Sequence, residues 1–188
     1  MSSLPIAINS EWSLFLDRDG VINKRIPDDY VKNCEQFILL PGVVEAMKIF
    51  SDIFEYIFIV TNQQGIGKGV MTENELTVIH SFMTNEIEKE GGRIDKVYFS
   101  PYLESEHHPM RKPAPGMALQ AKNDFSTIRF NHSIMAGDSI SDMLFGKNLG
   151  MTTVFISDSL KQCRENFKLI DYCFPSLYDF AKETVKIT

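Results

Sequence analysis

Two carboxylates at the end of an apolar run are the side chains in this sequence best suited to chemistry. Trp12 and Leu14–Leu16 lead directly into Asp17, Asp19 and Gly20. A short apolar run of this kind is typical of a buried parallel strand, and open α/β sheets bind ligands at the carboxyl ends of such strands. Residues two apart on an extended chain point the same way, so Asp17 and Asp19 face one small site. Gly20 lets the chain turn sharply after them.

Carboxylates this close repel each other, so they require a cation or a shared proton. With Mg²⁺ between them, Asp17 is suited to act as a nucleophile, and Asp19 to hold a proton for a leaving group. The alternative is an ordinary turn after a strand, where Asp and Gly are common. This stretch alone leaves both interpretations open.

A second apolar run, Tyr56–Val60, delivers a hydroxyl and two amides at its end, Thr61, Asn62 and Gln63. The three alternate glycines of residues 65–69 then form a loop that can bring backbone N–H groups near an anion. Their spacing matches neither a Walker A loop nor a dinucleotide-binding fingerprint, so this loop is weak evidence by itself.

Basic and acidic groups also stand next to two predicted helix starts. Arg111 and Lys112 precede a proline-started helix, which suggests a phosphate clamp, although a surface basic pair is the alternative. The run 133–136 ends in Gly137 and Asp138, and Asp138 suits a metal ligand. Asp142 suits either a helix N-cap or a role behind the ligands.

Strands and helices alternate along the chain, which predicts an α/β sandwich with a mostly parallel sheet. All the candidate side chains then meet at one edge of that sheet. The other expected strands are short and lie at 37–40, 94–99, 152–156 and 171–174. The other expected helices are one with apolar positions over 43–50, one that begins at a capping box of Thr72 and Glu75 and ends at 91–92, and a final one over 177–185. His80, on the second helix, is expected to be packed or at the surface, and residues 24–36 form a long polar loop.

Composition narrows the class of protein. The chain has 188 residues and a net charge of −6, so we expect one domain over residues 1–188 and no nucleic-acid or membrane partner. No signal peptide or membrane-length apolar run is recognisable, which predicts a cytoplasmic protein, and we expect a monomer. The scattered cysteines, Cys34, Cys163 and Cys173, predict reduced, buried thiols.

Four motifs in order resemble those of the haloacid dehalogenase (HAD) superfamily: Asp17-x-Asp19-Gly20, Thr61 after a strand, Lys112 before a helix, and Gly137-Asp138 with Asp142. The longer strings around them, together with Asp29-Tyr30-Val31, resemble the branch of histidinol phosphatases and D,D-heptose 1,7-bisphosphate phosphatases.

This resemblance implies a Rossmann-like three-layer sandwich with minimal cap loops, and Mg²⁺-dependent hydrolysis of a small phosphorylated sugar in the synthesis of lipopolysaccharide precursors. Histidinol phosphate is the alternative substrate, and a non-catalytic phosphate-binding module is the alternative class. The resemblance implies that Asp17 is the nucleophile and Asp19 the acid and base, and that the phosphoryl group is bound by Thr61, Arg111 and Lys112. It implies that Mg²⁺ is held by Asp17, the Asp19 carbonyl and Asp138. It also implies substrate contacts from Arg25, Asp29, Tyr30, Asn62 and Gln63.

The sequence departs from that branch in two places. Its members usually carry three cysteines and a histidine on a zinc loop before the Arg–Lys pair, but residues 100–110 contain no cysteine, so zinc is not expected. The adjacent His107 and His108 point to opposite sides of an extended chain and suit one metal poorly. Ser139 stands where the heptose enzymes commonly have a lysine, which leaves the choice of substrate open.

Overall fold

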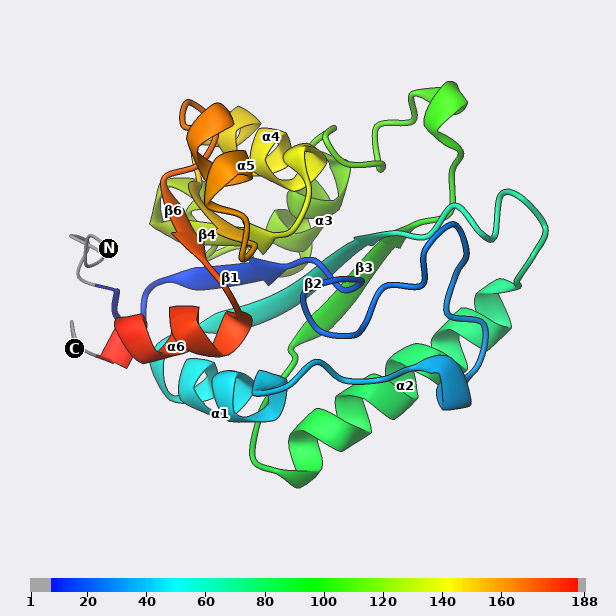
Figure 1. The fold of residues 1–188 in the computed structure, drawn as a ribbon, viewed down its shortest axis with the longest axis horizontal. Coiled ribbons are helices and arrows are strands. Elements are labelled where there is room, and N and C mark those ends of the chain that lie inside the picture. Colours follow the sequence, from blue (N-terminus) through cyan, green and yellow to red (C-terminus); the bar gives the residue numbers. More distant parts are fainter. Residues whose placement is uncertain (1–7, 186–188) are drawn as a thin grey trace.

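A computed structural model describes residues 8–185 and shows a six-stranded parallel sheet between two layers of helices (Figure 1). The order of the strands is β3-β2-β1-β4-β5-β6. The strands are β1 (Ser13–Leu16), β2 (Tyr56–Asn62), β3 (Lys96–Ser100), β4 (Ser133–Gly137), β5 (Thr152–Ile156) and β6 (Tyr172–Phe174). β1 pairs with β2 on one side and β4 on the other, so the direction of winding reverses at β1. Such a switch point is where sheets of this kind bind ligands.

Helices cover both faces of the sheet, and β1 supplies both cores. Leu14 and Leu16 lie in the larger apolar cluster, and Phe15, which points the other way, lies in the second. Figure 1 shows α1, α2 and α6 on one side of the sheet, and α3, α4 and α5 on the other. Their bounds are α1 (Val43–Ile53), α2 (Glu73–Lys89), α3 (Gly116–Asp124), α4 (Ile140–Asn148), α5 (Leu160–Glu165) and α6 (Leu177–Val185).

The predicted α/β class and six of the seven predicted strands are confirmed, with ends shifted by up to two residues. The predicted strand over residues 37–40 is wrong. Lys24 N donates to Ile38 O, and Leu40 N donates to Ile22 O, so this segment pairs with the long loop and not with the sheet. Only Leu39 forms an isolated bridge there, to Asn23.

The predicted capping box is confirmed at the start of α2. Thr72 Oγ1 accepts from Glu75 N, and the Glu75 carboxylate accepts from Thr72 N. The prediction missed α5, which is six residues long and too short to show a helical repeat. Its start is signalled only by Ser159, whose hydroxyl accepts from Gln162 N.

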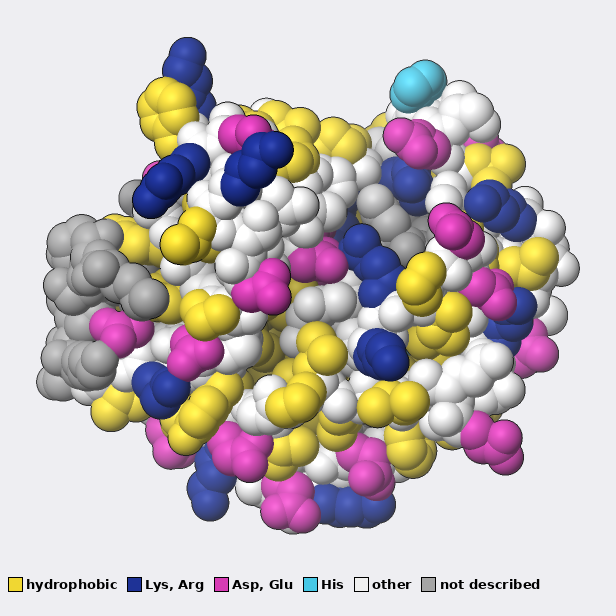
Figure 2. Space-filling model, in the orientation of Figure 1, with side chains coloured by type: hydrophobic (Ala, Val, Ile, Leu, Met, Phe, Trp, Pro, Cys, Tyr) yellow, Lys and Arg dark blue, Asp and Glu magenta, His cyan; other side chains and the backbone are white. Residues whose placement is uncertain are grey.

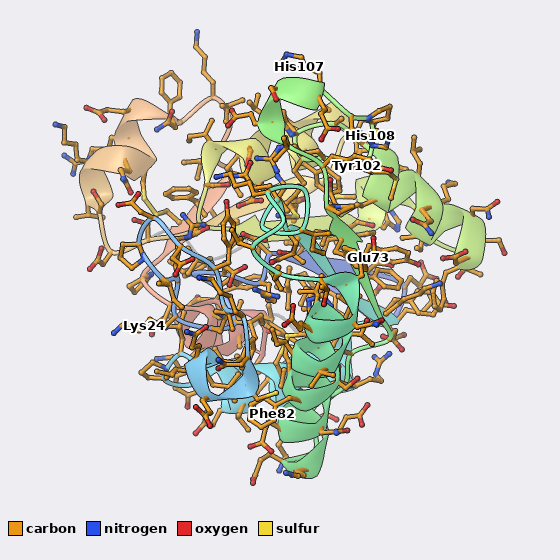
Figure 3. The ribbon with its side chains drawn as sticks, turned by 90° about the vertical axis from the view of Figure 1, so that its right-hand side faces the viewer. Lys24, Glu73, Phe82, Tyr102, His107 and His108 are labelled. Atoms are coloured by element: carbon orange, nitrogen blue, oxygen red, sulfur yellow. A yellow bond between two sulfur atoms is a disulfide. The ribbon has the colours of Figure 1, made fainter. Side chains whose placement is uncertain are left out.

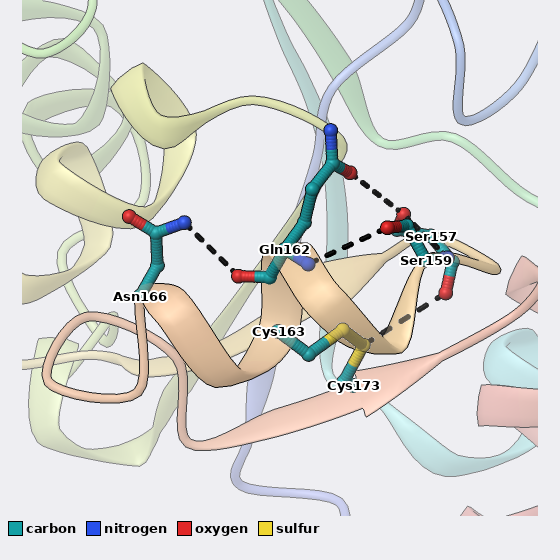
Figure 4. Close-up of a disulfide and its surroundings, with 6 residues drawn as sticks. All are labelled: Ser157, Ser159, Gln162, Cys163, Asn166 and Cys173. Atoms are coloured by element: carbon teal, nitrogen blue, oxygen red, sulfur yellow. Dashed lines mark hydrogen bonds between the residues drawn. A yellow bond between two sulfur atoms is a disulfide. The ribbon is translucent and has the colours of Figure 1, made fainter.

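The expectation of reduced, buried thiols is wrong. Cys163 on α5 and Cys173 on β6 form a disulfide (Figure 4), and Cys34 is only half-buried. The Cα atoms of the pair lie 6.2 Å apart, within the range that a disulfide spans. The error follows from the missed helix, because α5 is the element that turns Cys163 toward the edge strand.

None of the helices within residues 8–185 is long and apolar enough to cross a membrane. The N-terminal residues on which the expectation of no signal peptide rests lie outside the described part of the chain.

Candidate active site

The carboxyl edge of the central strands holds a cavity of about 460 Å³. β1 delivers Asp17 and Asp19 to it, β2 delivers Thr61 and Asn62, and the segment before α3 delivers Lys112. Figure 2 shows a hollow on this face, with Lys or Arg side chains beside Asp or Glu side chains at its rim. The site residues predicted from the sequence that line it are Asp17, Asp19, Arg25, Asp29, Tyr30, Thr61, Asn62, Arg111 and Lys112.

A buried ammonium group lies next to the candidate nucleophile. Lys112 Nζ lies 2.8 Å from Asp17 Oδ1, 2.6 Å from Asp142 Oδ1 and 2.7 Å from the carbonyl oxygen of Val60. Burial alone would lower the pKa of Lys112, but the charges of Asp142 and Asp17 outweigh it and raise this pKa above its usual value. Lys112 is therefore a fixed positive charge against the Asp17 carboxylate.

The pKa of Asp17 is raised, whereas the pKa of an acid in an exposed ion pair is lowered. Burial, with the nearby charge of Asp142, raises this pKa to about 7, although Lys112 opposes the shift. A group with this pKa is ionised only in part near neutral pH, and an added cation would favour its charged form.

Asp19 is fixed by three donors. Arg18 Nη2 lies 2.9 Å from Oδ1 and 2.8 Å from Oδ2, Asn23 Nδ2 donates to Oδ1 at 2.9 Å, and Gln63 Nε2 donates to Oδ2 at 2.8 Å. Burial would raise the pKa of Asp19, but the Arg18 charge and these hydrogen bonds hold it below its usual value. The carboxylate thus has one well-defined orientation beside Asp17.

A metal ion fits between the acidic groups. Asp17, Asp138 and Asp142 each offer a carboxylate oxygen within 4.8 Å of the others. Asp138 Oδ1 and the carbonyl oxygen of Asp19 already converge on one cationic group, because Arg25 Nη2 lies 2.8 Å from the first and 3.0 Å from the second. Burial raises the pKa of Asp138 to about 6, although Arg25 opposes the shift.

Gly20 is required for this arrangement. A Cβ atom at this position would lie 2.0 Å from Asp138 Oδ2, and the backbone φ of +95° also favours glycine. Ser139, not Asp142, is the N-cap of α4, and Asp142 is the third helical residue of its capping box. Asp142 Oδ2 accepts from Ser139 N, and its Oδ1 pairs with Lys112.

Two predicted substrate contacts turn out to hold other site residues. Gln63 is fully buried, and its amide donates to Thr61 Oγ1 as well as to Asp19, so in this structure it holds two residues of the site. Asn62 lines the cavity, but its side chain also donates to Lys112 O and accepts from Lys112 N. It therefore fixes the segment that carries Lys112.

The long loop after β1 contributes a polar wall to the cavity. Asp29 pairs with Lys32 at 2.8 Å, and the ring of Tyr30 lies 5.4 Å beneath the ammonium of Lys68. Lys68, which also lines the cavity, was not predicted as a site residue. Its only sequence signal is its place in the glycine loop after β2.

Aromatic stacking orders the loop before Arg111. The rings of Tyr102 and His108 stack with centroids 3.3 Å apart, and Figure 3 shows them side by side, with His107 at the outer turn. His108 Nδ1 accepts from Met110 N at 3.2 Å, and Arg111 Nη1 donates to Tyr102 O at 3.3 Å. This stack brings Arg111 to the cavity through ring packing and hydrogen bonds.

The chain is similar to known proteins over most of its length. Residues 109–180 match a family described as HAD-hydrolase-like. A D-glycero-α-D-manno-heptose-1,7-bisphosphate 7-phosphatase of Mycobacterium tuberculosis is 36% identical over 171 residues, which cover 91% of this chain and 90% of that protein. The α enzyme of Campylobacter jejuni is 37% identical over 83% of this chain and 88% of its own length. The corresponding β enzyme of Yersinia pestis is 32% identical over 90% of this chain and 93% of its own length.

Solved structures show the same fold. The D,D-heptose 1,7-bisphosphate phosphatase of B. bronchiseptica, complexed with magnesium and phosphate, superposes with a TM-score of 0.82 at 23% identity, over 94% of this chain and 99% of that one. A putative HAD-like phosphatase of Mesorhizobium loti superposes with a TM-score of 0.76 at 26% identity, over 95% of this chain and 88% of that one.

Proposed function

We propose that this chain, which belongs to the family of heptose-1,7-bisphosphate 7-phosphatases among the HAD-like hydrolases, removes the 7-phosphate of D-glycero-D-manno-heptose 1,7-bisphosphate. One observation carries the chemistry: the Asp17 carboxylate lies against a buried lysine, with Asp19 on the same strand end and a cavity in front of both. In this role the chain would serve the synthesis of heptose precursors for cell-envelope polysaccharide.

Asp17 acts as the nucleophile in the first step. Its carboxylate oxygen forms a bond to phosphorus while the bond from phosphorus to the sugar oxygen breaks. The electron pair goes to that oxygen, which takes a proton from Asp19. The pKa of Asp19 is low without substrate, but the negative charge of the bound phosphate raises it, so that Asp19 takes up this proton when substrate binds. The product of this half-reaction is an aspartyl-phosphate and a free sugar hydroxyl.

Water completes the cycle in the second step. Its oxygen bonds to phosphorus, the bond to Asp17 breaks, and Asp19 takes up the proton that the water loses. The three donors to Asp19 hold its carboxylate in one place for both transfers. Asp19 thus ends each cycle in the protonation state in which it began.

Cationic and polar side chains bind the transferring group. Lys112, Arg111 and the Thr61 hydroxyl line the cavity beside Asp17, where they neutralise the negative charge that spreads over the phosphoryl oxygens. Arg25 and Lys68 line the same cavity. These two cations, which stand in addition to Lys112 and Arg111, support a substrate that carries a second phosphate.

Mg²⁺ is the cofactor that the donor set supports, because carboxylate and carbonyl oxygens are its preferred ligands. Asp17, the carbonyl oxygen of Asp19 and Asp138 would hold it, with Asp142 behind them. When bound, it supplies positive charge that offsets the repulsion between Asp17 and the incoming phosphate.

A panel of substrates tests this proposal. Phosphate release is measured with Mg²⁺ on both anomers of heptose 1,7-bisphosphate, on histidinol phosphate and on fructose 1,6-bisphosphate. We expect a kcat/KM for one heptose anomer at least about 100-fold above the others, which corresponds to about 2.7 kcal/mol. A preference for histidinol phosphate would reassign the substrate within the phosphatases, and no release from any compound would favour a non-catalytic phosphate-binding module.

A further inference from the structure

Arg18 is a fully buried arginine that faces away from the cavity, between the two candidate catalytic aspartates. β1 ends at Leu16 and the chain bends at Arg18, whose side chain reaches α2. Its Nη2 reaches both oxygens of Asp19, at 2.9 and 2.8 Å. The orientation of this guanidinium therefore determines the plane of the Asp19 carboxylate.

The other side of the guanidinium is held by α2. Arg18 Nη1 lies 3.1 Å from His80 Nε2, across a sequence separation of 62 residues. Arg18 Nε has no hydrogen-bond partner within residues 8–185. His80 is thus the side chain that anchors the end of Arg18 that does not touch Asp19.

The imidazole of His80 has the right protonation state to accept this hydrogen bond. Burial and the charge of Arg18 lower the pKa of His80 to about 3, so the ring is neutral at physiological pH. A neutral imidazole has one unprotonated nitrogen, and the contact with Arg18 identifies it as Nε2. The ring is also packed edge-on against Phe99, with centroids 6.1 Å apart.

We propose that His80 is a positioning residue for the reaction, which acts through Arg18 to hold the Asp19 carboxylate in line with the leaving oxygen. This inference rests on the proposed phosphatase function and adds to it a residue on α2 that lies outside the cavity. An apolar side chain at position 80 would leave a buried N–H of Arg18 without a partner, and the guanidinium would then shift toward other acceptors.

The test compares a substrate whose leaving group needs a proton with one whose leaving group does not. His80→Leu and His80→Ala remove the acceptor, and His80→Gln restores one. For the alkyl phosphate of the panel that the unaltered protein turns over fastest, H80L and H80A should lower kcat/KM at least about tenfold. For p-nitrophenyl phosphate, whose leaving group needs no proton from Asp19, the loss should stay below about threefold. H80Q should recover most of the activity on the alkyl substrate.

Met83→Leu is the matched control, because Met83 is also fully buried on α2 and the substitution conserves its volume. It should leave both substrates unaffected, and thermal melting shows that each variant is folded. An equal loss on both substrates in H80L and H80A would assign His80 a purely structural role, and no loss on either would also overturn the inference. Absence of phosphate release by the unaltered protein would instead reject the proposed function, and this inference with it.

Discussion

At the scale of single residues, the ionised form of Asp17 that the chemistry requires destabilises the fold. Burial raises its pKa from 3.8 to about 7. Between these two values the folded protein binds a proton that the unfolded chain has released. The free energy of unfolding therefore falls as the pH rises from about 4 to about 7, because the folded state resists ionisation of this group.

Asp17→Asn should remove this dependence. In metal-free protein at pH 8, we expect the variant to melt several degrees above the unaltered protein, since a kcal/mol corresponds to about 2–4 °C for a chain of this size. Its melting temperature should also vary less between pH 4 and pH 7. Thermal melting in a chelating buffer measures both effects, and an unchanged pH slope would argue against the raised pKa.

Lys112→Met should have the opposite effect on stability. Without the ammonium, Asp17 and Asp142 face each other as buried carboxylates, which should cost about 3–5 kcal/mol at pH 8. At pH 5 the loss should be smaller, because Asp17 is then protonated. Urea unfolding at the two pH values measures this difference, and an equal loss at both would contradict the proposed pairing.

At the scale of elements, the loop of residues 101–110 determines where Arg111 lies. His108→Ala removes the stacking on Tyr102 and the acceptor for Met110 N. We expect kcat/KM for the heptose bisphosphate to fall about tenfold, since a misplaced Arg111 neutralises less of the charge on the phosphoryl group. His107→Asn is the matched control, because His107 has a φ of 47°, which Asn tolerates. Similar kinetics for the two variants would exclude a special role for the stack.

The capping box of α2 should affect stability but not catalysis. Thr72→Ala removes the hydroxyl that accepts from Glu75 N, and this should lower the free energy of unfolding by about 1 kcal/mol. Urea unfolding and steady-state kinetics on the same preparation separate the two effects. A change in kcat would show that the start of α2 contributes to the site.

The sequence predicts elements well where apolar spacing is strong. β1 and β2 are continuous apolar runs, and α2 has both a capping box and an apolar face, so all three were predicted close to their observed bounds. α5 has no buried residue and only six positions, so it leaves no periodic pattern. The disulfide that depends on it was missed for the same reason.

At the scale of the whole molecule, parallel topology explains why the candidate site was largely predictable. The carboxyl ends of β1, β2 and β4 must meet at one edge, so residues that follow them meet as well. Contacts that depend on packing between distant segments were not predictable. Arg18 with His80 and Tyr30 with Lys68 involve side chains whose partners are set by how α2 and the loops dock.

The formation of an aspartyl-phosphate is the direct test of Asp17 as the nucleophile. The protein is mixed with Mg²⁺ and heptose bisphosphate, quenched in acid within milliseconds and reduced with borohydride, which converts an acyl phosphate on aspartate into homoserine. Peptide mass spectrometry then locates the change. We predict homoserine at position 17 in the unaltered protein, and none without substrate. Rapid phosphate release with no modification at Asp17, or with homoserine at another aspartate, would contradict nucleophilic attack by Asp17.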